Sequence, residues 1–129
     1  GETLESPAHP RTYGNFARLL GRYVREEQAL PLAQAIRGLT SLPATNLGLR
    51  DRGRLAASNF ADIVIFDPAT IGDHASFADP HGYSTGASDV FVNGIQVVAG
   101  GRHTGATPGR VVRGPGWTGW PDGGACGRR

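Results

Sequence analysis

The start of this sequence holds the side chain best suited to binding a small anion. A His-Pro-Arg turn places His9 two residues before Arg11. The planar guanidinium of Arg11 could bind a carboxylate through two charge-assisted hydrogen bonds. From the residues alone, a solvated loop cation or an ion pair with Glu2 or Glu5 is the favoured interpretation, because exposed cations usually have no more specific role.

The other reactive groups do not follow a known catalytic pattern. Zinc enzymes that hydrolyse amides need closely spaced histidines, and this sequence contains neither a His-x-His pair nor an HExxH motif. His74 and His81 stand near Asp73 and Asp79 in one segment, where solvated loop residues are favoured over an adventitious metal site. Cys126 lies in a glycine-rich stretch that offers no partner for a nucleophile.

The composition is that of a small domain without a nucleic-acid or membrane signature. A chain of 129 residues can form one modest core, whereas a complete (β/α)₈ barrel needs about 250 residues. The 13 basic residues against 11 acidic ones give a net charge of +2, and they are spread along the chain, so we predict no nucleic-acid partner. Neither a membrane-spanning run nor a secretory leader is visible. We therefore predict a cytoplasmic protein without a membrane partner.

The first part of the sequence predicts helices that follow a loop. Residues 1–12 lack periodicity and carry Pro7 and Pro10, which indicates an extended loop. A helix with Asn15 as its N-cap should follow, and Pro31 should stand in the first turn of a second helix. The apolar stripe expected on the first helix is Phe16, Leu19, Leu20, Tyr23 and Val24. The expected buried side of the second helix is Leu32, Ala35, Ile36 and Leu39.

The pattern changes from helical to extended near residues 48–54. A third helical turn over Pro43–Leu47 should end at Gly48, which can adopt a left-handed conformation. Residues 63–66 predict a short, mostly buried strand closed by Asp67-Pro68, because β-branched residues fit a sheet and proline cannot continue it.

The strongest local signal is a hairpin. Val90–Val92 and Ile95–Val98 flank Asn93-Gly94, a dipeptide that favours the two positive-φ positions of a type I′ turn. Residues 69–87 before it read as a long irregular connection. Val111-Val112 could add a last strand, and residues 114–129 read as a disordered tail. The layout predicts an α+β fold in which helices precede a mostly antiparallel sheet.

In this order, the elements resemble the C-terminal part of a zinc-dependent amidohydrolase of the N-acyl-D-amino-acid deacylase (D-aminoacylase) family. Residues 40–68 carry a superfamily signature in which Gly53 makes a turn and Asp62 and Asp67 bind the backbone around a strand. These two carboxylates are expected to be structural. Ser58 departs from the family pattern, which usually has glycine there, and indicates a tolerated turn variant.

The resemblance also implies roles for the N-terminal segment. His9 to Phe16 follow the His-Pro-Arg-x-Tyr-Gly-x-Phe pattern typical of D-aminoacylase-like deacylases, and residues 92–114 resemble their closing hairpin. Arg11 would hold the α-carboxylate of an N-acyl-D-amino acid, and His9 would line the same pocket. No catalytic residue or metal ligand is expected in this chain. The zinc cofactor and a proton-transferring Asp would belong to sequence before Gly1, so that the chain would be an inactive fragment.

The implied division assigns residues 1–48 to the end of a (β/α)₈ barrel, with an active-site loop at 1–14. Residues 49–113, with a long loop at 69–87, would supply strands of the small β-sandwich domain, and residues 114–129 the tail. The alternative is a non-catalytic, β-rich module that docks on a partner chain or associates with itself. Self-association would use Phe16, Leu20, Tyr23, Ile36 and Leu39, a set too apolar to remain in water.

Overall fold

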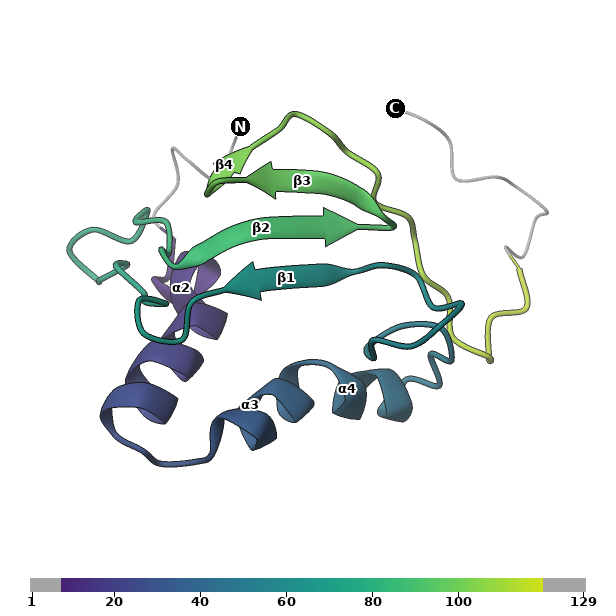
Figure 1. Cartoon of the computed structure of the whole chain (residues 1–129), viewed down its shortest axis with the longest axis horizontal. Helices are drawn as coiled ribbons and strands as arrows, with labels where there is room; N and C mark the ends of the chain where they lie inside the picture. The colour runs from purple at the N-terminus through teal and green to yellow at the C-terminus, as the bar shows by residue number, and fades with distance from the viewer. Residues whose placement is uncertain (1–7, 120–129) are drawn as a thin grey trace.

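The computed structural model describes residues 8–119, which form an α+β fold with one antiparallel sheet (Figure 1). The four strands lie in the order β1-β2-β3-β4. Figure 1 shows α3 and α4 on the β1 side of the sheet, away from β4. The elements are α2 (Arg11–Arg18), η1 (Leu19–Glu26), α3 (Leu32–Leu39), α4 (Ser41–Asn46), β1 (Ile63–Phe66), β2 (Ala87–Val92), β3 (Ile95–Ala99) and β4 (Arg102–His103).

The first helix begins earlier than its sequence pattern predicts. Pro10 is the N-cap of α2 and has helical dihedral angles, φ −49° and ψ −33°. Its ring fixes φ near the helical value, and the Gly14 N–H donates to the Pro10 carbonyl at 3.2 Å. The predictions of a loop through residue 12 and of Asn15 as N-cap are therefore wrong, because Pro10 nucleates the helix and Asn15 lies inside it.

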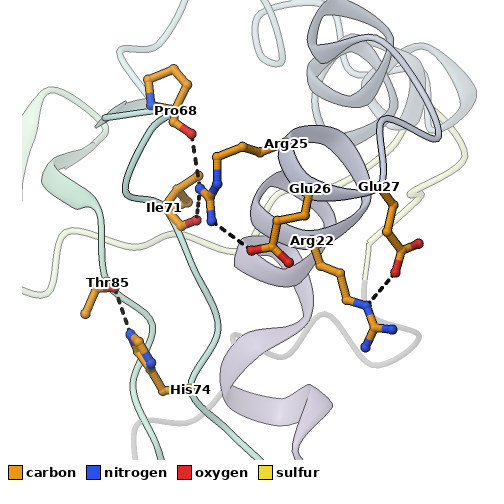
Figure 2. A network of polar contacts seen from close by, with 8 residues as sticks. All are labelled: Arg22, Arg25, Glu26, Glu27, Pro68, Ile71, His74 and Thr85. Carbon is orange, nitrogen blue, oxygen red and sulfur yellow. Dashed lines mark hydrogen bonds and ion pairs between the residues drawn. The ribbon is translucent and has the colours of Figure 1, made fainter.

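The helix continues as the π-helical segment η1, in which backbone hydrogen bonds join residues that lie further apart in the sequence than in an α-helix. The N–H of Glu27 donates to the carbonyl of Arg22, five residues earlier, at 2.8 Å. A Cβ on Gly21 would come within 2.6 Å of the Ile71 carbonyl, so the helix backbone lies directly against the turn that follows β1. Arg25 stabilises the same contact. Its guanidinium donates hydrogen bonds to the carbonyls of Pro68 at 3.1 Å and Ile71 at 2.6 Å (Figure 2).

Most of the apolar residues predicted to form the buried side of the second helix, α3, face the core. Pro31 is its N-cap rather than a first-turn residue, and Ala35 is buried at its centre. Ile36 and Leu39 pack against the core, whereas Leu32 is 36% exposed.

Helix α4 ends in the glycine cap predicted for it. Gly48 has φ +68°, and its N–H donates to Thr45 while the Leu49 N–H donates back to Ala44. Gly53 has φ +78°, and a Cβ there would lie 2.5 Å from that of Ala44, so glycine is required at the predicted turn.

The sheet forms around the predicted strand and hairpin. β1 pairs with β2, and β2 pairs with β3 across Asn93 and Gly94, whose φ values are +51° and +81°. The prediction of a strand at Val111-Val112 is wrong: that segment is irregular, and β4 pairs with β3 instead. Gly100 and Gly101, with φ +54° and +76°, make this second tight turn.

The core is small and lies between the helices and the turn after β1. Its buried cluster is Ala17, Leu20, Ala35 and Ile71, with Phe66 and Ala87 packed against it. The predicted burial of β1 is wrong within this chain, since Val64 is 56% and Ile65 49% exposed. Successive strand residues face opposite sides of a sheet, so the middle of β1 is exposed on both faces, whereas Ile63 and Phe66 at its ends are half-buried.

The first helix also leaves part of its apolar stripe in solvent. Leu20 is buried, but Phe16 is 67% and Tyr23 39% exposed. Whether self-association covers these two residues stays a prediction.

The C-terminal segment returns from β4 to the end of α4 (Figure 1). A Cβ on Gly48 would lie 3.0 Å from the Pro115 ring, and one on Gly114 would lie 3.2 Å from the Leu47 carbonyl. Cys126 and the rest of the predicted tail beyond residue 119 lie outside the described residues, as do Glu2 and Glu5.

Candidate functional site

The predicted site residues line a hollow between the start of α2 and the connection from β1 to β2. Its volume is about 360 Å³. Arg11, Asn15 and Arg18 stand at positions i, i+4 and i+7, which places them on one face of α2. The lining residues are His9, Pro10, Arg11, Asn15, Arg18, Asp73, Ala75, Ser76 and Phe77. The fold thus brings both predicted residues together with a segment that the sequence did not single out for this site.

His9 is held in a fixed orientation at the entrance to α2. Its Nδ1 accepts a hydrogen bond from the backbone N–H of Arg11 at 3.1 Å. A neutral ring in this position therefore carries its hydrogen on Nε2. The ring meets Phe77 edge to face, with centroids 5.1 Å apart and an interplanar angle of 75°.

Arg11 is the cation of this hollow that stays available. It is exposed at the first position of α2, and its guanidinium has no hydrogen bond or ion pair with any residue from 8 to 119. The location in a helix corrects the predicted loop position, but the side chain still lines the hollow. A free guanidinium at this place can accept a carboxylate in a bidentate arrangement.

Arg18, by contrast, is neutralised by Asp73. Its Nη1 lies 3.4 Å from Asp73 Oδ2, and the Asp73 side chain is only 7% exposed. Asp73 Oδ1 also accepts a hydrogen bond from the Ala75 N–H at 2.8 Å. The carboxylate is thus fixed by a cation on one side and by its own loop on the other.

Gly14 makes room for this carboxylate. A Cβ on Gly14 would lie 1.7 Å from Asp73 Oδ1, so no other residue fits without displacing Asp73. The sequence predicts Asp73 as a solvated loop residue and does not place it at this hollow, which it lines. A glycine inside a helix pattern was the available signal, since helices disfavour glycine unless something packs closely against it.

The remaining histidines have local partners and do not gather. His81 Nδ1 lies 3.2 Å from the Tyr13 hydroxyl, and the Tyr13 ring also meets Tyr83 edge to face. His74 Nε2 lies 2.9 Å from the Thr85 hydroxyl (Figure 2). Between residues 8 and 119, no three His, Cys, Asp or Glu side chains form a group that could hold a metal ion. The donor set of this part of the chain therefore does not fit a zinc site.

The two aspartates expected to be structural serve turns away from the hollow. Asp62 accepts from the Asn93 N–H at 2.8 Å and pairs with Arg52, which links β1 to the hairpin. Asp67 accepts from the Ala69 N–H at 2.8 Å and closes the turn after β1. Their predicted roles are confirmed.

A second, more open hollow of about 500 Å³ lies between residues 48–52 and 110–115. Its Arg52 is tied to Asp62 and stacks on Phe60 at 4.2 Å. Arg113 stacks on Trp117 at 4.6 Å. Its residues contribute to holding the hairpin and the C-terminal segment, and it contains none of the predicted site residues.

Arg22 lies on η1, outside the hollow, and pairs with an acidic side chain. The pKa of Arg22 is raised above its ordinary value by its hydrogen bond to Glu27, 2.6 Å away, and by that carboxylate's charge (Figure 2).

No helix between residues 8 and 119 is long and apolar enough to cross a membrane.

The curated relatives that match most of this chain include two deacylases of one organism. The N-acyl-D-glutamate deacylase of Alcaligenes xylosoxydans xylosoxydans is 47% identical over 107 residues, and the match covers 81% of this chain and 21% of that enzyme. The D-aminoacylase of the same organism is 44% identical over 104 residues, covering 81% of this chain and 22% of that enzyme. This chain therefore spans about a fifth of the length of these relatives.

Solved structures of deacylases also match this chain. A crystal structure of a D-aminoacylase, said to define a novel subset of amidohydrolases, matches with a TM-score of 0.75 and 40% identity over 78% of this chain and 21% of that one. The N-acyl-D-glutamate deacylase of Bordetella bronchiseptica, solved with zinc and a phosphonate inhibitor, matches with a TM-score of 0.70 and 44% identity over 75% of this chain and 21% of that one. The sequence profile of the amidohydrolase family covers residues 7–98, and the chain belongs to this family.

Proposed function

We propose that this chain is the C-terminal region of a metal-dependent amidohydrolase that hydrolyses N-acyl-D-amino acids to a carboxylate and a D-amino acid. The observation that carries the proposal is the Arg11 guanidinium, which has no partner among residues 8–119 and lines a hollow that also contains His9. The identity to N-acyl-D-amino-acid deacylases, over most of this chain, supports the substrate class.

Arg11 would anchor the α-carboxylate of the substrate. Two parallel N–H···O bonds fix both the position and the plane of a carboxylate, which orients the amide relative to the reacting groups. His9, fixed by the Arg11 N–H and the Phe77 ring, would form one wall of the same pocket. Neither residue would take part in bond cleavage.

The metal and the proton-transferring Asp would come from the preceding part of the enzyme. The described side chains do not gather into a metal site, so the role assigned to this chain is binding and orientation. A metal ion would polarise the amide carbonyl and activate the attacking water. We predict that the chain alone has no deacylase activity.

The helices would close a (β/α)₈ barrel and the strands would join its small β-sandwich domain, with residues 1–48 and 49–113 as the two parts. The exposed apolar side chains of α2 and of β1 support this division, because surfaces of this kind are normally covered by other protein. Residues 114–129 would be the tail, and a cytoplasmic location stays a prediction.

The test is an assay of the protein obtained by extending the reading frame upstream of Gly1, beside the isolated chain. We expect the extended protein, loaded with zinc, to hydrolyse N-acetyl-D-methionine and to leave N-acetyl-L-methionine intact. The isolated chain should hydrolyse neither. An extended protein without activity on any N-acyl-D-amino acid would contradict the proposal.

A second candidate is a non-catalytic module that docks on a partner chain or on itself. The exposure of Phe16, Val64 and Ile65 favours it, since these side chains would gain from being covered. Activity of the extended protein decides between the two functions, because a docking module would have none.

A further inference from the structure

We propose that Arg25 is a positioning residue for the substrate site and acts through the connecting loop, residues 72–85, between β1 and β2. The inference rests on the proposed function and adds a residue to it. Arg25 lies on η1 and does not line the hollow that contains Arg11 and His9. It therefore acts on the substrate through the connecting loop, which contacts the residues on both sides of Arg11.

The connecting loop is closed at its base. Gly72 and Thr85 exchange two backbone hydrogen bonds, at 3.2 and 3.0 Å, and His74 Nε2 lies 2.9 Å from the Thr85 hydroxyl (Figure 2). A Cβ on Gly86 would come within 2.4 Å of the Ile71 Cα, so the two arms of the base lie directly against each other. Surface loops whose ends meet in this way are compact units, and they are often functional.

Arg25 attaches this base to η1. Its Nη1 donates to the carbonyls of Pro68, at 3.1 Å, and Ile71, at 2.6 Å, and Ile71 directly precedes the connecting loop (Figure 2). Its Nη2 pairs with Glu26 at 3.2 Å, which orients the guanidinium. Removing Arg25 takes this donor from both carbonyls and weakens the attachment of the loop to the helix.

The other end of the connecting loop holds the chain around Arg11. Phe77 meets the His9 ring edge to face, with centroids 5.1 Å apart, and His81 Nδ1 lies 3.2 Å from the Tyr13 hydroxyl. His9 stands two residues before Arg11 and Tyr13 two residues after it. A shift at the base of the loop therefore changes the position of the Arg11 guanidinium. Misplacing a substrate-orienting group by about 1 Å can lower a rate by a factor of about 10².

The experiment is a double-mutant cycle in the extended enzyme, with kcat/KM for N-acetyl-D-methionine as the measured quantity. Arg25→Gln should lower kcat/KM about tenfold, mainly through a higher KM, because a misplaced Arg11 loses contacts with the substrate carboxylate. In an Arg11→Lys background the same change should cost less than about twofold, since the residue through which Arg25 acts is already impaired. If the effects of the two substitutions multiply, Arg25 only supports the fold and the inference is wrong.

Arg22→Gln is the matched control. It removes the same charge from the same helical segment, but Arg22 is hydrogen-bonded to Glu27 and not to the base of the connecting loop. Its kcat/KM should equal that of the wild type. A loss as large as that of Arg25→Gln would assign the effect to the missing charge and overturn the inference.

His81→Ala tests the same inference if Arg25→Gln does not fold. It leaves the base of the connecting loop intact and removes the contact with Tyr13. We expect kcat/KM to fall at least about threefold, and by less than that in the Arg11→Lys background. An unchanged kcat/KM would overturn the inference and leave the proposed function intact. Absence of wild-type activity on N-acyl-D-amino acids would instead overturn the proposed function, and this inference with it.

Discussion

At the scale of single residues, the contact between Gly14 and Asp73 organises the candidate site. The resemblance to the deacylase family implies Arg11 and His9 as site residues, because the His-Pro-Arg motif that carries it is local in the sequence. Asp73 comes from a distant part of the chain, and only the folded backbone brings its carboxylate over Gly14. Gly14 is therefore the feature of the local sequence that indicates this tertiary contact.

Gly14→Ala should destabilise the chain, although alanine is the better helix former. The new Cβ would lie 1.7 Å from Asp73 Oδ1, so the carboxylate must leave Arg18 or the Ala75 N–H. Lost hydrogen bonds of this kind cost about 1–3 kcal/mol, more than the gain of about 1 kcal/mol in helix propensity. Thermal or urea unfolding would measure the difference.

Gly38→Ala in α3 is the control, since a Cβ there has no atom within 4 Å. It should raise the melting temperature, because alanine has a higher helix propensity than glycine and no contact is lost. Equal stabilisation by both substitutions would show that Asp73 is not held where the structure has it.

At the scale of elements, turns were more predictable than helix starts or burial. Asn93-Gly94, Gly53 and Gly48 all adopt the positive φ values that their residue types favour, because such preferences are local. The start of α2 differs from its prediction because proline favours a loop as well as the first turn of a helix. The strand β4 has only two residues, so its own sequence carries little signal, and it forms because Gly100 and Gly101 make a tight turn after β3.

Gly94→Val tests the hairpin. A β-branched residue forced to φ +81° should lower the free energy of unfolding by about 1–2 kcal/mol. Gly109→Val is the control, because Gly109 does not have positive φ and a Cβ there meets no atom within 4 Å. A Gly94→Val protein as stable as the Gly109→Val protein would contradict the type I′ turn.

At the scale of the whole molecule, the chain has more apolar surface than its small core uses. The predicted α+β layout is present, and the resemblance to the N-acyl-D-amino-acid deacylase family is confirmed by 44–47% identity to its curated members. Burial of β1 could not be judged from its sequence. A run of apolar residues marks a surface that some protein covers, without specifying whether that protein is the same chain.

The isolated chain should therefore associate with itself. Light scattering should give a concentration-dependent mass above that of the 13.5 kDa monomer. Phe16→Glu, at a side chain 67% exposed on α2, should shift the equilibrium toward the monomer. Leu55→Glu, in an irregular segment outside α2 and 82% exposed, should not. A wild-type chain that stays monomeric at all concentrations would contradict this prediction.

The most direct test of the central claim is the effect of Arg11→Lys on kcat/KM for N-acetyl-D-methionine in the extended enzyme. Lysine keeps the charge but loses the bidentate fork, so kcat/KM should fall at least about tenfold, equivalent to about 1.4 kcal/mol, with little change in melting temperature. The same substitution at Arg37, which is exposed on α3, should leave kcat/KM unchanged. If Arg11→Lys retains the wild-type kcat/KM, Arg11 does not anchor the substrate carboxylate and the assignment of this site is wrong.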